Sequence, residues 1–170
     1  AVLGNGYPMD KLEIIVVNDG STDNTADVVK TYKNVVLFNK LNSGKADSVN
    51  KAIQKSKHEF VAIIDADSYP TKDSLKEIMK YFADEKVGAV TGACMVKNKN
   101  NLLEKCQAME YVLIAWTRKT LDALHSVFVT PGSLSAYRKK ALEDIGGGFD
   151  KNIMTEDIEI AWNLLRHKWK

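Results

Sequence analysis

The chain has 170 residues, of which 45% are hydrophobic, and its formal net charge is +2. This size and apolar content suit one globular domain with a buried core. The charge is nearly balanced and Lys is spread along the chain, so composition does not argue for nucleic acid, and none is expected as a partner. No apolar stretch reaches the roughly 20 residues of a membrane span, so we expect these residues to be soluble.

Apolar runs alternate with amphipathic stretches in the first part of the chain. Continuous β-branched runs, typical of strands covered on both faces, predict strands at 12–17, 34–39, 59–65 and 87–96. Apolar residues at helical spacing predict helices between these strands, at 25–33, 43–57 and 71–84. This order predicts a mostly parallel sheet within a three-layer α/β/α fold.

The predicted helix starts carry residues that favour N-caps. Ser21, Thr22 or Asp23 is expected to cap the first helix, and Thr71 the third. The alternation ends near residue 97. Further on, the pattern predicts helices at 101–124 and 155–169, a short strand and turn within 129–142, and a glycine-rich bend at 145–150.

Polar side chains follow the predicted strands. Asp19 ends the first, and the third ends in Asp65-Ala66-Asp67. Because ligands of open α/β sheets bind beyond the carboxyl ends of the strands, these carboxylates are placed for a ligand. Alternate strand residues lie about 6.6–7 Å apart, too far to share one small cation comfortably. The spacing therefore favours one carboxylate for a diphosphate-bound metal and the other for a hydroxyl, with a plain turn as the alternative.

Two helix starts carry further candidates. Lys45 follows Gly44 in the first turn of a helix, where the helix dipole and the ammonium group both favour a phosphate. An exposed lysine without a ligand is the alternative. In the last helix, Thr155 suits an N-cap, and Glu156 and Asp157 suit the positive helix end. The functional alternative makes Asp157 a general base, whose pKa the dipole would lower and burial would raise.

Five segments in this order resemble glycosyltransferase family 2. They are EIIVVNDGSTDNT, NSGKADSVNKAI, FVAIIDADSYP, TPGSLSAYRKKALEDIGGGFD and TEDIEIAWNLLRHKWK. The TED triplet looks most similar to the membrane-bound β-glycan synthases, such as chitin, hyaluronan, cellulose and poly-N-acetylglucosamine synthases. The resemblance runs from about residue 7 to the end of the chain.

The resemblance implies a GT-A (Rossmann-like) fold and transfer of a sugar, with inversion, from a nucleotide donor. UDP-sugar is the implied donor, and a glycan or lipid-linked hydroxyl the acceptor. A single domain over 1–170 would comprise a nucleotide-binding half, 1–97, and an acceptor-side half, 98–170. By resemblance, Asp19 would contact the nucleotide base, Lys45 the diphosphate or ribose, and Asp65 the ribose or donor sugar. Asp67 would bind Mg²⁺ or Mn²⁺, and Asp157 would be the catalytic base. Gly132, Ser133 and Glu156 would lie on the acceptor side.

The sequence also departs from the family pattern. The family's usual first strand, of the type V-x-V-I-I-P-x-Y-N-E, is absent, as is the glutamine-arginine-tryptophan motif that follows the TED helix. That first strand would lie between the strands at 12–17 and 59–65. We therefore expect a truncated catalytic domain with incomplete activity, in which these two strands pair directly or a second copy lends a strand, giving a strand-swapped homodimer.

The localisation expected from the resemblance is the cytoplasmic face of a membrane, with the membrane segments of the full-length protein outside these residues. Two cysteines without disulfide or metal-site spacing, Cys94 and Cys106, agree with a reducing compartment.

Two other functions remain open on the residues alone. A nucleotidyltransferase that makes nucleotide-sugars also uses a three-layer sheet, a metal and strand-end carboxylates, but it usually has a glycine-rich basic loop that is absent here. A non-catalytic nucleotide-binding domain is the other alternative, and the joint presence of Asp19, Asp65, Asp67 and Asp157 argues against it.

Overall fold

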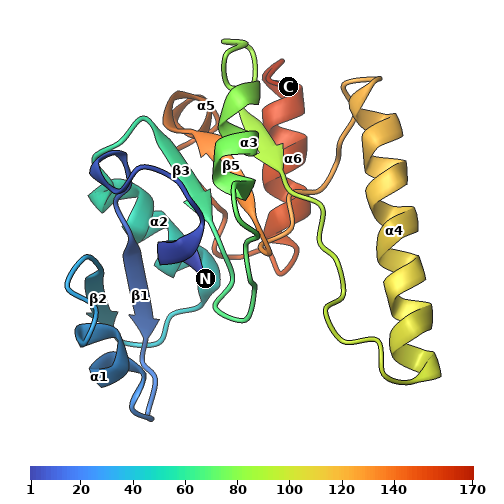
Figure 1. Cartoon of the computed structure of the whole chain (residues 1–170). Coiled ribbons are helices and arrows are strands. Elements are labelled where there is room, and N and C mark those ends of the chain that lie inside the picture. The colour runs from blue at the N-terminus through green and yellow to red at the C-terminus, as the bar shows by residue number, and fades with distance from the viewer.

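The computed structural model describes residues 1–170 and is shown in Figure 1. Its strands are β1 (Ile15–Asp19), β2 (Val36–Lys40), β3 (Phe60–Ile63), β4 (Ala89–Thr91) and β5 (Ser135–Arg138). Its helices are α1 (Thr25–Lys30), α2 (Lys45–Lys55), α3 (Ser74–Tyr81), α4 (Leu102–Asp122), α5 (Lys139–Asp144) and α6 (Glu156–Arg166), preceded by the 3-10 turns η1 (Val2–Gly4) and η2 (Met9–Lys11). Every strand and helix that the pattern predicts is present, most of them shorter than predicted.

The strands form two sheets. β1 and β2 pair in parallel, with Ile15 opposite Val36. β5 lies between β3 and β4 and pairs antiparallel to both. This corrects the expectation of a mostly parallel sheet in one respect. After α4, the chain returns to the sheet beside the end of β3, so β5 runs antiparallel to its neighbours.

The three-layer arrangement is confirmed by the two hydrophobic cores. Side chains of β3 alternate between them because successive residues of a strand face opposite ways. Val61 and Ile63 pack on the core that α2, α5 and α6 cover, whereas Phe60 packs on the core beneath α3. The central residue of β5, Ala136, is 1% exposed.

The neighbouring edges of β1 and β3 do not pair with each other, because the two strands belong to different sheets. The expectation that they pair directly is therefore wrong. Instead, a cavity of about 780 Å³ is lined by residues of both strands. The apolar run of β1 is consequently only half-buried, although its sequence is typical of a strand covered on both faces.

Two of the predicted N-caps differ in the structure. The N-cap of α1 is Asn24, and Asp23 instead accepts a hydrogen bond from the backbone N–H of Thr25 (3.0 Å). α3 begins after Asp73, in the left-handed region with φ 67°, and not at Thr71. In both cases the turn that leaves the preceding strand extends further than the capping residues suggested.

Helix α4 stands apart from the body of the molecule in Figure 1. Many of its large apolar side chains are exposed, among them Leu103 and Trp116, whereas Arg118 is buried. No helix in the structure combines the length and the hydropathy required to cross a membrane. Cys94 and Cys106 are both unpaired thiols.

Candidate active site

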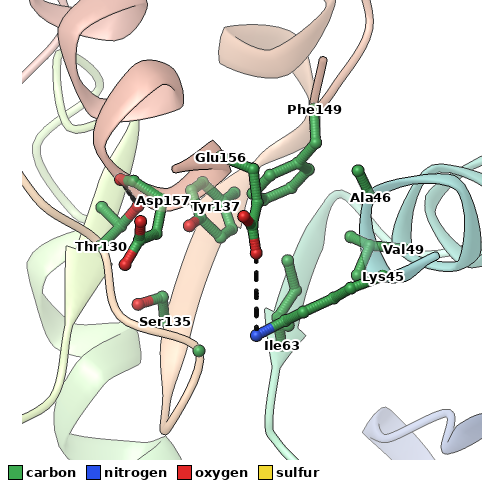
Figure 2. A pocket seen from close by; sticks show the side chains of 11 residues that line it. Lys45, Ala46, Val49, Ile63, Thr130, Ser135, Tyr137, Phe149, Glu156 and Asp157 are labelled. Carbon is green, nitrogen blue, oxygen red and sulfur yellow. Dashed lines mark hydrogen bonds and ion pairs between the residues drawn. The ribbon is translucent and has the colours of Figure 1, made fainter. Parts of the chain in front are cut away.

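Residues from three distant segments meet at a small hollow beside the end of β3, shown in Figure 2. Four of the predicted site residues line it. Lys45 enters from α2, Gly132 from the loop before β5, and Glu156 and Asp157 from the first turn of α6. The structure therefore brings the predicted donor-side lysine and the predicted base to the same place.

Lys45 connects the two sides of this hollow. Its Nζ lies 2.8 Å from Oδ1 of Asp65 and 4.0 Å from Oε1 of Glu156, the contact that is dashed in Figure 2. Asp65 is held in place by its backbone, because its N–H donates to the carbonyl of Gly132 (2.8 Å). The ammonium group of Lys45 is thus placed between the tip of β3 and the start of α6.

Gly132 fits this arrangement because it has no side chain. A β-carbon built at this position would lie 2.6 Å from Oδ2 and 2.7 Å from Oδ1 of Asp65, and closer still to Nζ of Lys45. A side chain at this position would therefore displace the ammonium group of Lys45 and the carboxylate of Asp65, and not backbone atoms. Ser133 follows in the same turn and is half-buried.

The first turn of α6 is fixed by Thr130. The carbonyl oxygen of Asp157 accepts hydrogen bonds from the N–H (3.1 Å) and the hydroxyl (3.0 Å) of Thr130. Thr155 is the N-cap residue, as predicted, but its side chain makes no capping hydrogen bond. The position of the carboxylate of Asp157 therefore depends on the loop that carries Gly132.

Tyr137 underlies this part of the hollow, and sequence reasoning missed it. The residue is 1% exposed, and its ring meets that of Phe149 edge to face, with centroids 5.7 Å apart. Burial raises the pKa of Tyr137 to about 12, and the nearby carboxylates of Asp157 and Glu156 add to this effect. The phenol therefore stays protonated at neutral pH. A four-residue strand carries too little periodicity to show which of its side chains faces a site.

The glycine-rich bend before the TED triplet is anchored by Asn50 of α2. Its Oδ1 accepts from the N–H of Phe149, and its Nδ2 donates to the carbonyl of Phe149, both at 2.8 Å. Gly148 has a φ of 144°, and a β-carbon there would collide with Asn50. The bend thus has a defined contact with α2.

Asp19 lies at the end of β1 and does not line the hollow. Its carboxylate pairs with Lys40 and accepts hydrogen bonds from the N–H groups of Ser43 (2.9 Å) and Gly44 (3.0 Å). Pairing with Lys40, with a further contribution from these two N–H groups, lowers the pKa of Asp19. Asp19 therefore joins the end of β1 to the start of α2, and its contact with a nucleotide base stays a prediction.

Lys40 connects Asp19 to a second carboxylate. Its Nζ lies 3.3 Å from Asp47, and the side chains of Lys40 and Asp47 are only 5% and 6% exposed. Asp47 also pairs with Lys51 (2.8 Å) and Lys151 (2.5 Å). Although burial opposes it, pairing with Asp19 and Asp47 raises the pKa of Lys40. This nearly buried network supports the start of α2, and hence Lys45.

Asp67 lies in the exposed turn after β3, outside the hollow. The turn is closed by the N–H of Ser68, which donates to the carbonyl of Asp65 (2.9 Å). No group of three or more His, Cys, Asp or Glu residues is placed to hold a metal ion. One exposed carboxylate at a strand tip nevertheless fits Mg²⁺ or Mn²⁺, because Mg²⁺ typically takes one or two carboxylates together with substrate phosphates.

The fold is the GT-A fold of glycosyltransferases. A mannosyltransferase from Pyrobaculum calidifontis, in complex with GDP-Man and Mn²⁺, is 27% identical with a TM-score of 0.73, and the match covers 99% of this chain and 47% of that one. S. aureus TarS 1-349, in complex with UDP-GlcNAc, has the same fold, with a TM-score of 0.64 at 21% identity over 95% of this chain and 47% of its own.

The sequence comparisons identify the family. The profile of glycosyl transferase family 2 matches residues 1–146, and the chain belongs to this family. The poly-beta-1,6-N-acetyl-D-glucosamine synthase of Staphylococcus epidermidis is 35% identical over 96% of this chain and 40% of its own length. That of Staphylococcus aureus strain COL is also 35% identical, over 91% and 39%. The chain thus spans about two fifths of these relatives.

These matches confirm the resemblance to family 2. The chain therefore carries a domain of a glycosyltransferase family, which favours sugar transfer over the two alternative functions.

Proposed function

We propose that this domain transfers a sugar from a UDP-sugar to an acceptor hydroxyl, with inversion at the anomeric carbon and with a divalent metal. The observation that carries the proposal is the convergence of Lys45 and Asp157 at one hollow, with Asp65 paired to Lys45, although the three residues lie 20 to 112 positions apart in the sequence. A cation beside a strand tip and a carboxylate across from it are the two charges that inverting transfer needs.

On the donor side, the diphosphate lies between Lys45 and the tip of β3. Asp67 would hold Mg²⁺ or Mn²⁺, which neutralises the charge that develops on the departing diphosphate. Lys45 exchanges its contact with Asp65 for a phosphate oxygen, and the freed carboxylate of Asp65 accepts from a hydroxyl of the ribose or the sugar. Asp19 holds the start of α2 and contacts the base.

On the acceptor side, Asp157 takes the proton from the attacking hydroxyl. Because Thr130 fixes the backbone of Asp157, the carboxylate keeps its position relative to the loop of Gly132 and Ser133, along which the acceptor sugar lies. Glu156, 4.0 Å from Lys45, keeps the ammonium group oriented between the donor and acceptor sides. Residues 1–97 thus serve the nucleotide, and residues 98–170 the acceptor.

The substrate assignment follows the relatives. Two curated relatives are named as poly-N-acetylglucosamine synthases, and a structural neighbour is bound to UDP-GlcNAc. UDP-N-acetylglucosamine is therefore the first donor to test, with GDP-mannose as the competing donor because another neighbour binds it. A growing glycan or a lipid-linked glycan is the acceptor, and the full-length protein works at the cytoplasmic face of a membrane.

Calorimetric titration of UDP in the presence of Mn²⁺ tests the donor site. We expect binding that is lost with EDTA and in Asp67→Ala, whereas Asp27→Ala, which removes an exposed aspartate of α1, leaves it unchanged. GDP and dTDP should bind more weakly than UDP. UDP binding that is unchanged by EDTA and by Asp67→Ala would contradict the metal site. If no nucleotide binds, the donor site as a whole is contradicted.

The catalytic base is tested separately. Asp157→Asn should leave UDP affinity unchanged and lower the rate of sugar transfer or donor hydrolysis by about 10²-fold or more, as expected for removal of a positioned base. If UDP affinity falls by as much as the rate, Asp157 belongs to the nucleotide-binding site.

A further inference from the structure

Tyr137 is a polar side chain of the core to which the proposed reaction gives no role. It lies on β5, the central strand of its sheet, opposite Val61 of β3 and Ala89 of β4. Only 1% of the residue is exposed, yet it is one of the residues that line the hollow. A buried phenol normally has a hydrogen-bond partner, so its hydroxyl group needs an explanation.

The ring of Tyr137 is held in one position. It meets Phe149 edge to face, and Phe149 is itself fixed by two hydrogen bonds with Asn50. Figure 2 shows the phenol oxygen on the side of the hollow where Thr130 and Asp157 lie. A central strand and a packed ring thus direct one hydroxyl group to the start of α6.

The neighbours of the phenol determine in which direction it donates. Its side-chain hydrogen-bonding neighbours are Thr130 and Ser135. A hydroxyl group has one hydrogen and two lone pairs. Thr130 gives its hydrogen to the carbonyl oxygen of Asp157 (3.0 Å). Ser135 gives its own to the carbonyl oxygen of Pro131 (2.7 Å). Both hydroxyl groups can therefore only accept from Tyr137, and the phenol is the donor.

Thr130 is the better acceptor of the two. The oxygen of Ser135 lies 3.3 Å from the hydroxyl of Thr91, whereas the hydroxyl of Thr130 is engaged only with the backbone of Asp157. A hydrogen bond that Thr130 accepts polarises its hydroxyl group and strengthens the bond that it donates. The result is a chain of two hydrogen bonds, from Tyr137 to Thr130 and from Thr130 to the first turn of α6.

We propose that Tyr137 is a positioning residue, which holds the carboxylate of Asp157 at the acceptor hydroxyl through the side chain of Thr130. This role rests on the proposed function of Asp157 as the base. A base that is slightly displaced slows the chemical step and leaves the binding of the donor unaltered. Removal of the phenol oxygen should therefore lower kcat and leave the KM of the donor unchanged.

A double-mutant cycle tests this role in the reaction. Tyr137→Phe removes only the phenol oxygen, and Thr130→Val replaces the hydroxyl group by a methyl group. Each change should lower the kcat of sugar transfer or donor hydrolysis by about 2- to 10-fold, the range of one hydrogen bond. The double variant should be no slower than Thr130→Val, because both changes break the same chain. Tyr32→Phe, at a tyrosine that is 50% exposed, is the matched control and should keep the wild-type kcat.

Hydrogen exchange tests the same chain without a reaction. The backbone N–H of Thr130 also donates to the carbonyl oxygen of Asp157, so its exchange reports on this contact. In Tyr137→Phe, this amide should exchange about 2- to 10-fold faster. The amide of Glu77, in the helix that covers the other core, should exchange at the wild-type rate.

Three outcomes would overturn the proposal. Unchanged exchange of the Thr130 amide in Tyr137→Phe, or additive losses of kcat in the double variant, would show that Tyr137 does not act through Thr130. Equally faster exchange of the Glu77 amide would reduce Tyr137 to a general packing residue. If Asp157→Asn keeps the wild-type rate while the Thr130 amide still responds, the base assignment fails, and the positioning role fails with it although the hydrogen-bond chain is present.

Discussion

Replacing Gly132 by alanine should disturb the active site and leave the fold intact. The added methyl group would lie 2.6 Å from Oδ2 of Asp65 and displaces the Lys45–Asp65 contact. These side chains are 49% and 36% exposed, and an exposed ion pair contributes at most about 1 kcal/mol. Gly132 lies outside the left-handed region, so alanine also restricts the unfolded chain, which stabilises by about 0.4–1 kcal/mol. The free energy of unfolding should therefore change by less than about 1 kcal/mol.

Nucleotide binding should respond differently. If Lys45 can no longer reach the diphosphate, the loss of one charged hydrogen bond of about 1.5–3 kcal/mol weakens UDP binding roughly 10- to 150-fold. Urea unfolding and calorimetric titration of UDP measure the two quantities on the same protein. Gly4→Ala is the matched control, because no atom lies within 4 Å of a β-carbon there. Unchanged UDP affinity in Gly132→Ala, or a loss of several kcal/mol of stability, would refute the reasoning.

Three further predictions concern the surroundings of the site. Asn50→Ala removes both hydrogen bonds to Phe149 and should lower the free energy of unfolding by about 1–3 kcal/mol, measured in urea, with Asn50→Asp losing only the donor. Pairing with Lys151, and then with Lys51, holds the pKa of Asp47 well below its usual range, so its contribution is complete above about pH 4 and is lost as the pH falls. In Asp47→Asn, the free energy of unfolding should fall less steeply with decreasing pH than in the wild type. An unchanged slope in this variant would show that the pairing is absent in solution. Because burial raises the pKa of Tyr137 to about 12, its contribution is complete below about pH 10 and is lost between there and pH 12. Ultraviolet titration should show one of the six tyrosines ionising last, and Tyr137→Phe should remove that step.

Much of the fold follows from local patterns in the sequence. Apolar runs that end in turn residues predict β1 to β4, and helical spacing predicts α2, α3, α4 and α6, because both patterns report which side chains a regular element buries. The antiparallel insertion of β5 does not follow, because strand direction depends on the route of the chain after α4. The open edges of β1 and β3 do not follow either, since a continuous apolar run reports expected burial and not the identity of the neighbouring strand.

Candidate site residues could be predicted where a charged residue lies at a strand tip or a helix start, because its position there has a direct electrostatic explanation. Lys45, Asp65 and Asp157 are of this kind, and the structure brings Lys45 and Asp157 to one hollow, with Asp65 paired to Lys45. Residues that act through others were missed. Thr130 fixes Asp157 through its backbone carbonyl, and Lys40 holds Asp19, and neither contact has a local sequence signal because each spans at least 20 residues.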